Sequence, residues 1–244
     1  MDCTIITGYS SGLGKEVARE LDKDNDNFII GVSRSFNPEI YVDYLEVDIS
    51  RYQYVLSCLS PMQFEEGTRV NVVLCASTLG KGGGLLDSDL RDWEYVLQTN
   101  LLGNLAVIKS VLPQMIKTQY GRIVFLAGGG AAYGYPLFSA YALSKVAIVR
   151  EVENIAIELK DVIDDFSIIS LAPGAMQTSM LKQVREAGAE IKTTVDIKEP
   201  VEFIKNFLNM DKEKAKSLSG RFIHVRDDLE SEDFKNKWLL RRIE

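Results

Sequence analysis

Short apolar runs alternate with amphipathic stretches along most of this chain. The apolar runs are CTIIT, FIIGVS, YLEVDI, VNVVLCAS, RIVFLA and FSIISLA. Helical patterns stand between several of them, and the two longest cover about 93–118 and 139–161. This alternation predicts an α/β fold: a doubly wound parallel sheet of about seven strands with helices on both faces. The strand runs are apolar throughout, as expected for strands that are covered on both sides.

The chain shows no internal repeat, no low-complexity segment and no linker rich in glycine and serine. We therefore expect a single domain over 1–244. The pattern changes after Pro173, where a helical stretch (TSMLKQVREAGAEI), a second helix (EPVEFIKNFLNM) and a short strand (RFIHV) precede a mixed-charge tail. We expect the segment of about 176–192 to form a lid which, with the tail 226–244, determines substrate choice.

Composition narrows the class of protein. The net charge of −7 argues against nucleic acid as a partner, because phosphate binding relies on clustered lysine and arginine. No run approaches eighteen apolar residues, and the first residues, MDCTIITG, carry an acid where a signal peptide carries positive charge. We expect a cytoplasmic protein with no membrane partner. Cys3, Cys58 and Cys75 are far apart and lack a neighbouring histidine, so we expect small buried side chains and no metal site.

The segment T-G-Y-S-S-G-L-G at 7–14 lies between an apolar strand and the start of a helix. Glycines permit a tight turn there, and they let a pyrophosphate approach the backbone at the positive end of the helix. This position favours a dinucleotide-binding loop over a plain turn. The expected contacts from the loop are Gly8, Ser10, Ser11, Gly12, Leu13 and Gly14.

The residues after the second apolar run bear on the choice of cofactor. An acid there would bind the ribose hydroxyls of NAD, whereas an arginine can pair with the additional phosphate of NADP. The chain has Ser33 and Arg34, so NADP is favoured and NAD is the alternative. The other interpretation of Arg34 is an exposed arginine with no role in binding. Further contacts are expected from Asp48, Ile49 and Ala76, at the ends of the next two runs. Asp48 has a second interpretation, as an acid at the N-terminus of a helix.

Tyr141 is the only tyrosine of the chain with a lysine, Lys145, four residues later. On a helix the two side chains lie on one face. A neighbouring ammonium group favours the phenolate and would lower the tyrosine pKa from about 10. Such a tyrosine can give a proton to a carbonyl oxygen or take it back. For the single histidine, His224, which lies in the last apolar run, we favour a structural role.

These motifs, taken together and in order, resemble the classical short-chain dehydrogenase/reductases over nearly the whole chain. The matching segments are TGYSSGLG, QTNLLGNL, GRIVFLAGGG, YALSK and LAPGAMQT. The resemblance implies a Rossmann fold, with Tyr141 as the acid/base and Lys145 as the residue that lowers its pKa and binds the nicotinamide ribose. It also implies that Asn100 holds a water of a proton relay. The stretch that would pack against the nicotinamide contains Pro173, Gly174 and Thr178.

The same resemblance implies a homodimer or a homotetramer in which the helices at 93–118 and 139–161 pack against their copies. Val146, Val149 and Ile157 are apolar positions that agree with such an interface. A role in the core of the domain is the other interpretation of these three residues.

Three features depart from the family pattern. The serine that usually stands thirteen residues before the tyrosine is replaced by Gly128, which begins a Gly-Gly-Gly segment. The family's Asn-Asn-Ala-Gly appears as LCAS, so we expect the asparagine that ties neighbouring strands to be lost. The spacing between Arg34 and Asp48 is too short for the usual helix, so we expect a loop. The glycines could offer main-chain donors, widen the pocket, or remain from a lost activity.

Three functions are therefore compared. The first is an NADP-preferring oxidoreductase that transfers a hydride between nicotinamide and a ketone or secondary alcohol, with a sugar or nucleotide sugar as candidate substrate. The second is a catalytically weak or inactive dinucleotide-binding sensor or scaffold, which the loss of the serine at Gly128 would favour. The third, a dehydratase or epimerase, fits less well, because such relatives carry a separate substrate domain. The first is our expectation.

Overall fold

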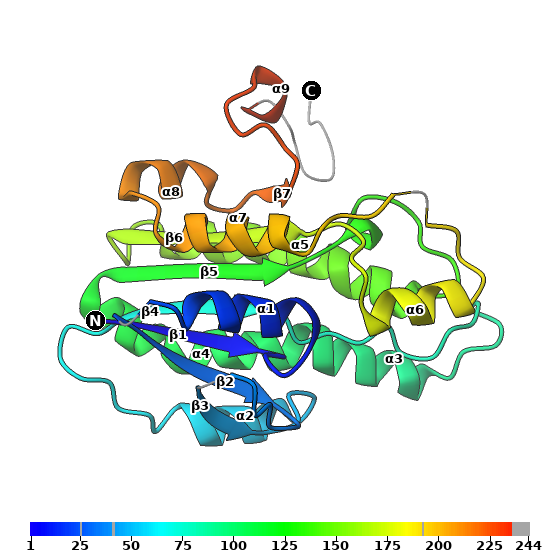
Figure 1. Cartoon of the computed structure of the whole chain (residues 1–244), viewed down its shortest axis with the longest axis horizontal. Helices are drawn as coiled ribbons and strands as arrows, with labels where there is room; N and C mark the ends of the chain where they lie inside the picture. Colours follow the sequence, from blue (N-terminus) through cyan, green and yellow to red (C-terminus); the bar gives the residue numbers. More distant parts are fainter. Residues whose placement is uncertain (25, 41, 192, 236–244) are drawn as a thin grey trace.

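A computed structural model describes residues 1–24, 26–40, 42–191 and 193–235, and within them seven strands form one parallel sheet (Figure 1). The strand order is β3-β2-β1-β4-β5-β6-β7, so the chain starts in the middle of the sheet and winds outwards in both directions. The strands are β1 (Asp2–Thr7), β2 (Asn27–Ser33), β3 (Asp43–Glu46), β4 (Arg69–Leu74), β5 (Tyr120–Leu126), β6 (Asp165–Ala172) and β7 (Phe222–His224). This topology confirms the predicted doubly wound sheet.

Helices cover both faces of the sheet, as Figure 1 shows. One face carries α2 (Tyr52–Leu59), α4 (Gly103–Thr118) and α5 (Ser139–Leu159), and the other carries α1 (Gly12–Leu21), α7 (Lys198–Leu208) and α8 (Lys212–Leu218). Adjacent residues of β1 show the division. Ile5 belongs to the apolar cluster on the side of α2, α4 and α5, and Ile6 belongs to the cluster on the side of α1, α7 and α8. Since both faces are covered, the strands are apolar at successive positions rather than at alternate ones.

The helix predicted over 93–118 extends from Leu90 to Thr118 in three consecutive parts. These are α3 (Leu90–Leu97), a π-helical turn η1 (Gln98–Leu102) and α4. A methyl group at Gly103, the first residue of α4, would lie 2.1 Å from the main-chain oxygen of Ile49. The glycine therefore lets α4 approach the chain that follows β3. Turns of the π type occur often at functional sites, and this one contains Asn100.

The remaining short helices are the 3-10 turn η2 (Gly129–Ala131), α6 (Ser179–Glu186) and α9 (Glu232–Lys235). In Figure 1, α6 lies beyond the tips of the strand arrows, in the segment that we expect to form a lid. No helix stands between β2 and β3 in the described residues, which confirms the loop predicted there. Position 192 of the expected lid and positions 236–244 of the expected tail lie outside the described residues.

Among the helices of the described part, none has the length and apolar character needed to cross a bilayer. All three cysteines are free thiols. Cys3 is buried, whereas Cys58 and Cys75 are partly exposed. The expectation of buried cysteines is therefore correct for Cys3 and wrong for the other two.

Candidate active site

A cavity of about 1060 Å³ lies at the carboxyl ends of the strands, where parallel α/β sheets bind their ligands. The cofactor-binding residues expected from the sequence all line it: Gly8, Ser10, Ser11, Gly12, Leu13, Gly14, Ser33, Arg34, Asp48, Ile49, Ala76, Tyr141, Lys145, Pro173, Gly174 and Thr178. The fold thus brings the glycine loop, the Tyr-Lys pair and the Pro-Gly stretch to one cavity. Asn100, the third expected catalytic residue, does not line it.

The glycine loop connects the end of β1 to the start of α1. Gly8 and Gly12 have φ angles of 69° and 56°, a region that residues with a side chain seldom adopt. A methyl group at Gly14 would lie 2.5 Å from the main-chain oxygen of Gly8. The glycines are therefore required by the backbone path itself. They also leave the main chain at the amino end of α1 uncovered by side chains on the cavity side.

The residues after β2 and β3 line the cavity next to the glycine loop, and Asn37 donates from Nδ2 to the Ser10 carbonyl oxygen at 2.9 Å. An exposed arginine, Arg34, donates from Nη1 to the Tyr95 hydroxyl at 3.3 Å. Ser33 donates to the main-chain oxygen of Ser35 at 2.7 Å. Tyr95 and Ser35 also line the cavity, although the sequence did not single them out. Their contacts pass between segments distant in the chain or through the main chain, so no local motif marks them.

Asp48 holds the turn that precedes α2. Its Oδ1 accepts hydrogen bonds from the Ser50 amide at 3.0 Å and from the Ser50 hydroxyl at 2.8 Å. The alternative interpretation of this acid, as a residue near a helix N-terminus, is therefore supported by these contacts. Because Asp48 also lines the cavity, a contact with the adenine remains a prediction.

Tyr141 and Lys145 lie in the first two turns of α5, on the face that lines the cavity. The Lys145 Nζ lies 5.2 Å from the centroid of the Tyr141 ring and donates to the main-chain oxygen of Leu126 at 2.8 Å. Burial lowers the pKa of Lys145 from 10.5 to about 7. The pair is thus close in space, as the helical spacing predicts.

The pKa of Tyr141 departs from the sequence-based expectation. Burial raises it above the ordinary tyrosine value, and the nearby phenols of Tyr135 and Tyr133 raise it further. The expected lowering by Lys145 is therefore wrong for this structure. The reason is that loss of hydration disfavours the phenolate and the ammonium alike, so each member of the pair is shifted towards its neutral form.

Asn100 is fully buried in the π-helical turn. Its Oδ1 accepts from the Thr78 amide at 2.7 Å, and its Nδ2 donates to the Thr78 carbonyl oxygen and the Ser144 hydroxyl, both at 2.9 Å. Ser144 in turn donates to the main-chain oxygen of Tyr141 at 2.6 Å. Asn100 therefore connects the segment after β4 to the helix that carries the Tyr-Lys pair. Its expected role in a proton relay stays a prediction.

The strand tie expected to be lost is made by a residue that the sequence did not single out, Asn104 of α4. Its Oδ1 accepts from the Thr7 hydroxyl at 2.8 Å, and its Nδ2 donates to the Ala76 carbonyl oxygen at 3.0 Å. The Ala76 amide donates to the Thr7 oxygen at 3.0 Å, which closes the link between the ends of β1 and β4. The available signal was a second asparagine one helical turn after Asn100.

Gly128 stands at the position where the resemblance implies a serine, and it lies beside Tyr141. A methyl group there would lie 3.3 Å from the Tyr141 hydroxyl oxygen. The φ angle of Gly128 is 151°, which strains any residue that has a side chain. The backbone at this point is therefore adapted to glycine, and no hydroxyl at position 128 faces Tyr141 without a change of the main chain.

The cavity wall nearest to α6 is largely apolar and aromatic. Its residues include Leu79, Tyr133, Tyr135, Met176, Met180, Leu181, Val184 and Ile191. His224 also lines the cavity, and its Nδ1 accepts from the Arg226 amide at 3.2 Å. This hydrogen bond is consistent with the structural role that we favour for His224. The sequence did not predict that His224 lines the cavity. Within the described part of the chain, no group of histidine, cysteine or acidic residues could hold a metal ion.

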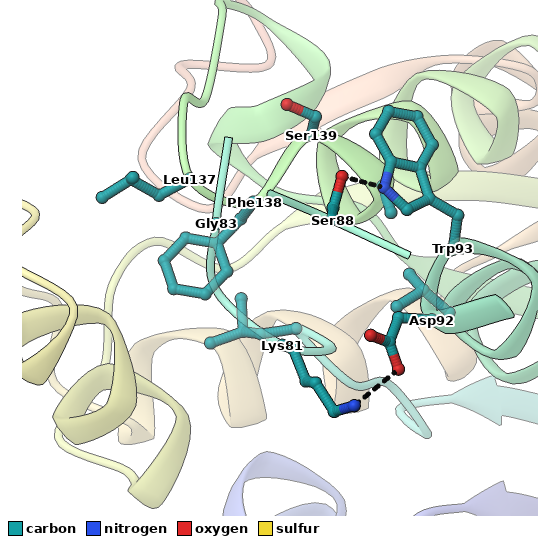
Figure 2. Close-up of a pocket in the computed structure, with 11 residues that line it drawn as sticks. Lys81, Gly83, Ser88, Asp92, Trp93, Leu137, Phe138 and Ser139 are labelled. Atoms are coloured by element: carbon teal, nitrogen blue, oxygen red, sulfur yellow. Dashed lines mark hydrogen bonds and ion pairs between the residues drawn. The ribbon is translucent and has the colours of Figure 1, made fainter. Parts of the chain in front are cut away.

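A much smaller hollow of about 10 Å³ lies where the loop before α3 meets the start of α5 (Figure 2). Lys81 and Asp92 form an ion pair of 3.3 Å on one side of it. The indole nitrogen of Trp93 donates to the Ser88 hydroxyl at 3.0 Å. A space of this size holds about one water molecule, so the hollow is part of the packing rather than a ligand site.

Comparison with known proteins identifies the family. The family model described as short chain dehydrogenase matches residues 2–189. The chain is 28% identical over 191 residues to the oxidoreductase UcpA of Salmonella typhimurium, covering 74% of this chain and 71% of UcpA. It is 31% identical over 156 residues to a 3-ketodihydrosphingosine reductase of Bacteroides thetaiotaomicron, covering 64% and 57% of the two chains. The protein therefore belongs to the short chain dehydrogenase family.

Solved structures agree with this assignment at the level of the fold. A structure described as ElxO with NADP bound superposes with a TM-score of 0.77 at 22% identity, covering 92% of this chain and 96% of ElxO. The resemblance inferred from the motifs is thus confirmed, as is the predicted fold.

Proposed function

We propose that this protein is an NADP-preferring oxidoreductase that interconverts a ketone and a secondary alcohol, with Tyr141 as general acid and base. NAD is the alternative cofactor. The observation that carries the proposal is the Tyr141 ring beside the buried Lys145, on the wall of the cavity that also contains the glycine loop. Tyr141 meets the first requirement for proton transfer, a hydroxyl at the site where a carbonyl could be bound.

The residues present fit a dinucleotide. At Gly12, the first residue of α1, an added methyl group would meet only the Thr178 side chain, at 3.9 Å, so a pyrophosphate has room to approach the main chain there. The cavity of about 1060 Å³ is slightly larger than the roughly 300–1,000 Å³ that is usual for small-molecule sites. Such a volume suits a long cofactor with a substrate beside it. The proposal follows the ElxO structure, which has NADP bound.

A nicotinamide dinucleotide, when bound, supplies the hydride that forms the new C–H bond at the carbonyl carbon. The Tyr141 hydroxyl gives its proton to the carbonyl oxygen, and the reverse transfer accompanies oxidation of the alcohol. Lys145 is held beside the ring by the Leu126 carbonyl, and its pKa of about 7 allows its amine to exchange a proton near neutral pH. Asn100 keeps α5 in place through Ser144.

The substrate end of the cavity favours an uncharged ketone. Among the described lining residues, the lysine and arginine side chains are Lys145 beside Tyr141 and Arg34 at the cofactor end. The apolar wall near α6 contains Met176, Met180 and Val184. A nucleotide sugar would bring phosphate charge to this wall, whereas an unphosphorylated sugar or an apolar ketone would not. We therefore place nucleotide sugars last among the candidate substrates, and we assign substrate selection to the lid segment at about 176–192.

The second candidate is a dinucleotide-binding protein with little or no turnover. The glycine at position 128 favours it, because loss of one donor to a reacting oxygen typically lowers kcat by about 10² to 10³. Against it stands the Tyr-Lys pair, which is in place and accessible from the cavity.

An assay of the purified protein separates the two candidates. NADPH is supplied with a panel of apolar ketones, ketosugars and nucleotide ketosugars, and loss of absorbance by the reduced nicotinamide is followed. We expect turnover with an uncharged ketone that Tyr141→Phe abolishes and that Tyr54→Phe, an exposed tyrosine on α2, does not. Tight binding of NADPH without turnover on any compound would contradict the oxidoreductase proposal and support the dinucleotide-binding sensor.

The apolar positions on α4 and α5 also bear on how copies of the protein associate. We propose a cytoplasmic homodimer or homotetramer formed through α4 and α5. Of the three apolar positions considered for the interface, Ile157 is 65% exposed. Val149 is fully buried in the core, and Val146 is partly buried against it, so the core interpretation holds for these two.

A further inference from the structure

The glycine segment after β5 is covered by a tyrosine. A methyl group at Gly129 would lie 2.2 Å from the Tyr133 hydroxyl oxygen and 2.8 Å from the ring carbon that carries it. The Tyr133 amide donates to the Gly129 carbonyl oxygen at 3.2 Å, so the chain turns back through η2 and lays the phenol over Gly129. The φ angle of Gly129 is not in the left-handed region. A side chain at residue 129 would therefore displace the Tyr133 phenol from this position.

The Tyr133 hydroxyl lies on the cavity wall shared with Tyr141, and 63% of the Tyr133 residue is exposed. Its hydroxyl makes no hydrogen bond to the rest of the chain that the structure describes. The charges that Tyr135 and, to a smaller extent, Tyr133 would carry as phenolates raise the pKa of Tyr141, so both phenols lie within electrostatic range of it. Tyr133 therefore offers a hydroxyl group on the wall of the cavity that Tyr141 also lines.

The far end of this segment is anchored. Figure 2 shows Phe138 and Leu137 meeting the loop around Gly83. The Gly83 amide donates to the Leu137 carbonyl oxygen at 2.9 Å, and Phe138 is only 2% exposed. η2 thus holds one end of the segment that carries Tyr133 and Tyr135, and Phe138 holds the other, while both tyrosines line the cavity.

We propose that the Tyr133 hydroxyl donates to the substrate carbonyl oxygen the hydrogen bond that the missing serine donates in other family members. This inference rests on the proposed function. The O–H of Tyr133 stays intact throughout, while the proton transferred to the carbonyl oxygen comes from Tyr141. The hydrogen bond stabilises the negative charge that develops on that oxygen as hydride arrives. Gly129 then has a positive purpose, because it makes room for a phenol from the following turn.

Tyr135 is the competing donor. Its ring centroid lies 6.1 Å from that of Tyr141 and 5.8 Å from that of Phe138. Tyr135 is partly buried and packs against the small apolar cluster around Leu79 and Phe138. Its ring is thus used as a packing surface, whereas the Tyr133 hydroxyl lies directly over the glycine segment.

The test compares Tyr133→Phe and Tyr135→Phe with the wild-type enzyme, using NADPH and the best ketone of the panel. We expect Tyr133→Phe to lower kcat by about 10²-fold, the effect of removing one donor from a reacting oxygen. Its dissociation constant for NADPH, followed by the fluorescence of the bound cofactor, should stay within about twofold. An unchanged kcat for Tyr133→Phe, or a loss confined to Tyr135→Phe, overturns the inference while the proposed function stands.

A second test displaces the Tyr133 phenol without removing its hydroxyl group. Gly129→Ala introduces a methyl group that collides with the Tyr133 hydroxyl, so it should lower kcat by a similar factor. In the Tyr133→Phe background the same change should add little, because there is no hydroxyl left to displace. Gly134→Ala is the matched control, since nothing lies within 4 Å of the added methyl group. Additive effects of the two changes contradict the inference. Absence of any wild-type turnover overturns the proposed function, and the inference with it.

Discussion

At the scale of single residues, burial controls the chemistry of the site more than neighbouring charge does. Lys145 is 2% exposed, and its ammonium group has one hydrogen bond within the described structure, to the Leu126 carbonyl oxygen. Loss of hydration therefore lowers its pKa to about 7 and raises that of Tyr141. A pair of this kind holds its proton on the phenol near neutral pH, which suits reduction of a carbonyl.

Lys145 should make the stability of the protein dependent on pH. Because its pKa falls from 10.5 in the unfolded chain to about 7 in the fold, the folded protein binds fewer protons between these values. The contribution of this residue to the free energy of unfolding then rises with pH over that window. Lys145→Met should be more stable than the wild type at pH 7, and the difference should shrink towards pH 9. Urea unfolding at several pH values measures this, and a constant difference would count against a lowered pKa.

Arg34 should decide between the two cofactors. Its guanidinium is exposed at the cofactor end, where its contact in the described structure is the Tyr95 hydroxyl, so it is available for a phosphate. We expect Arg34→Ala to weaken NADPH binding by about tenfold or more and NADH binding much less. Titration of both cofactors by fluorescence checks this, with Arg91→Ala, an exposed arginine outside the cavity, as control. Equal losses for NADPH and NADH would refute the assignment.

At the scale of elements, one close contact sets the position of the helix that carries Asn104. Gly103 lies against the main chain at Ile49, with no space for a methyl group. Asn104 then reaches Thr7 and Ala76 and joins the ends of the two central strands. The glycine and the asparagine act together, because the tie requires the helix to lie this close.

Gly103→Ala should therefore be severely destabilising. The added methyl group would lie 2.1 Å from the Ile49 main-chain oxygen, and a backbone atom cannot move aside as a side chain can. We expect the free energy of unfolding to fall by at least about 1–3 kcal/mol, the usual cost of overpacking. Denaturant unfolding is the measurement. Gly84→Ala, where the methyl group meets open space, should change little, and a neutral Gly103→Ala would contradict this account of the packing.

At the scale of the whole molecule, the outer side of the layer formed by α2, α4 and α5 carries apolar side chains that the domain does not cover. On α5, Leu143 is 48% exposed and Ile157 is 65% exposed. Leu102, the last residue of η1, is 39% exposed, and Ile116, near the end of α4, is 43% exposed. In each pair the residues are fourteen apart, a spacing that returns to nearly the same side of a helix. These side chains suit a two-fold contact between copies.

Leu143→Glu combined with Ile157→Glu should convert the assembly into monomers. Two charges on this surface would lose their hydration on association, and they would repel their copies across a two-fold axis. Sedimentation velocity should show a dimer or tetramer for the wild type and a monomer for the variant. Gln53→Glu, an exposed position on α2, serves as control. A monomeric wild type would remove the proposed assembly altogether.

The sequence by itself determined the features that depend on local pattern. The apolar runs indicated a sheet covered on both faces, and the spacing of Tyr141 and Lys145 placed both on one side of a helix. The loop at 7–14 marked the cofactor end, because a strand, a glycine turn and a helix follow one another directly along the chain. Such features require only neighbours in sequence and the geometry of regular structure.

Only the tertiary structure decided which residues that are far apart in the sequence contact one another, and how deeply the site is buried. The tie from Asn104 to Thr7 joins residues 97 positions apart, and no local motif reports it. The reversal of the expected Tyr141 pKa arises from burial by segments that converge on the cavity. Tyr133 reaches its place over Gly129 only because the chain turns back after β5. Hydration and packing at a site are set by everything that surrounds it in space, and adjacency along the chain does not encode that directly.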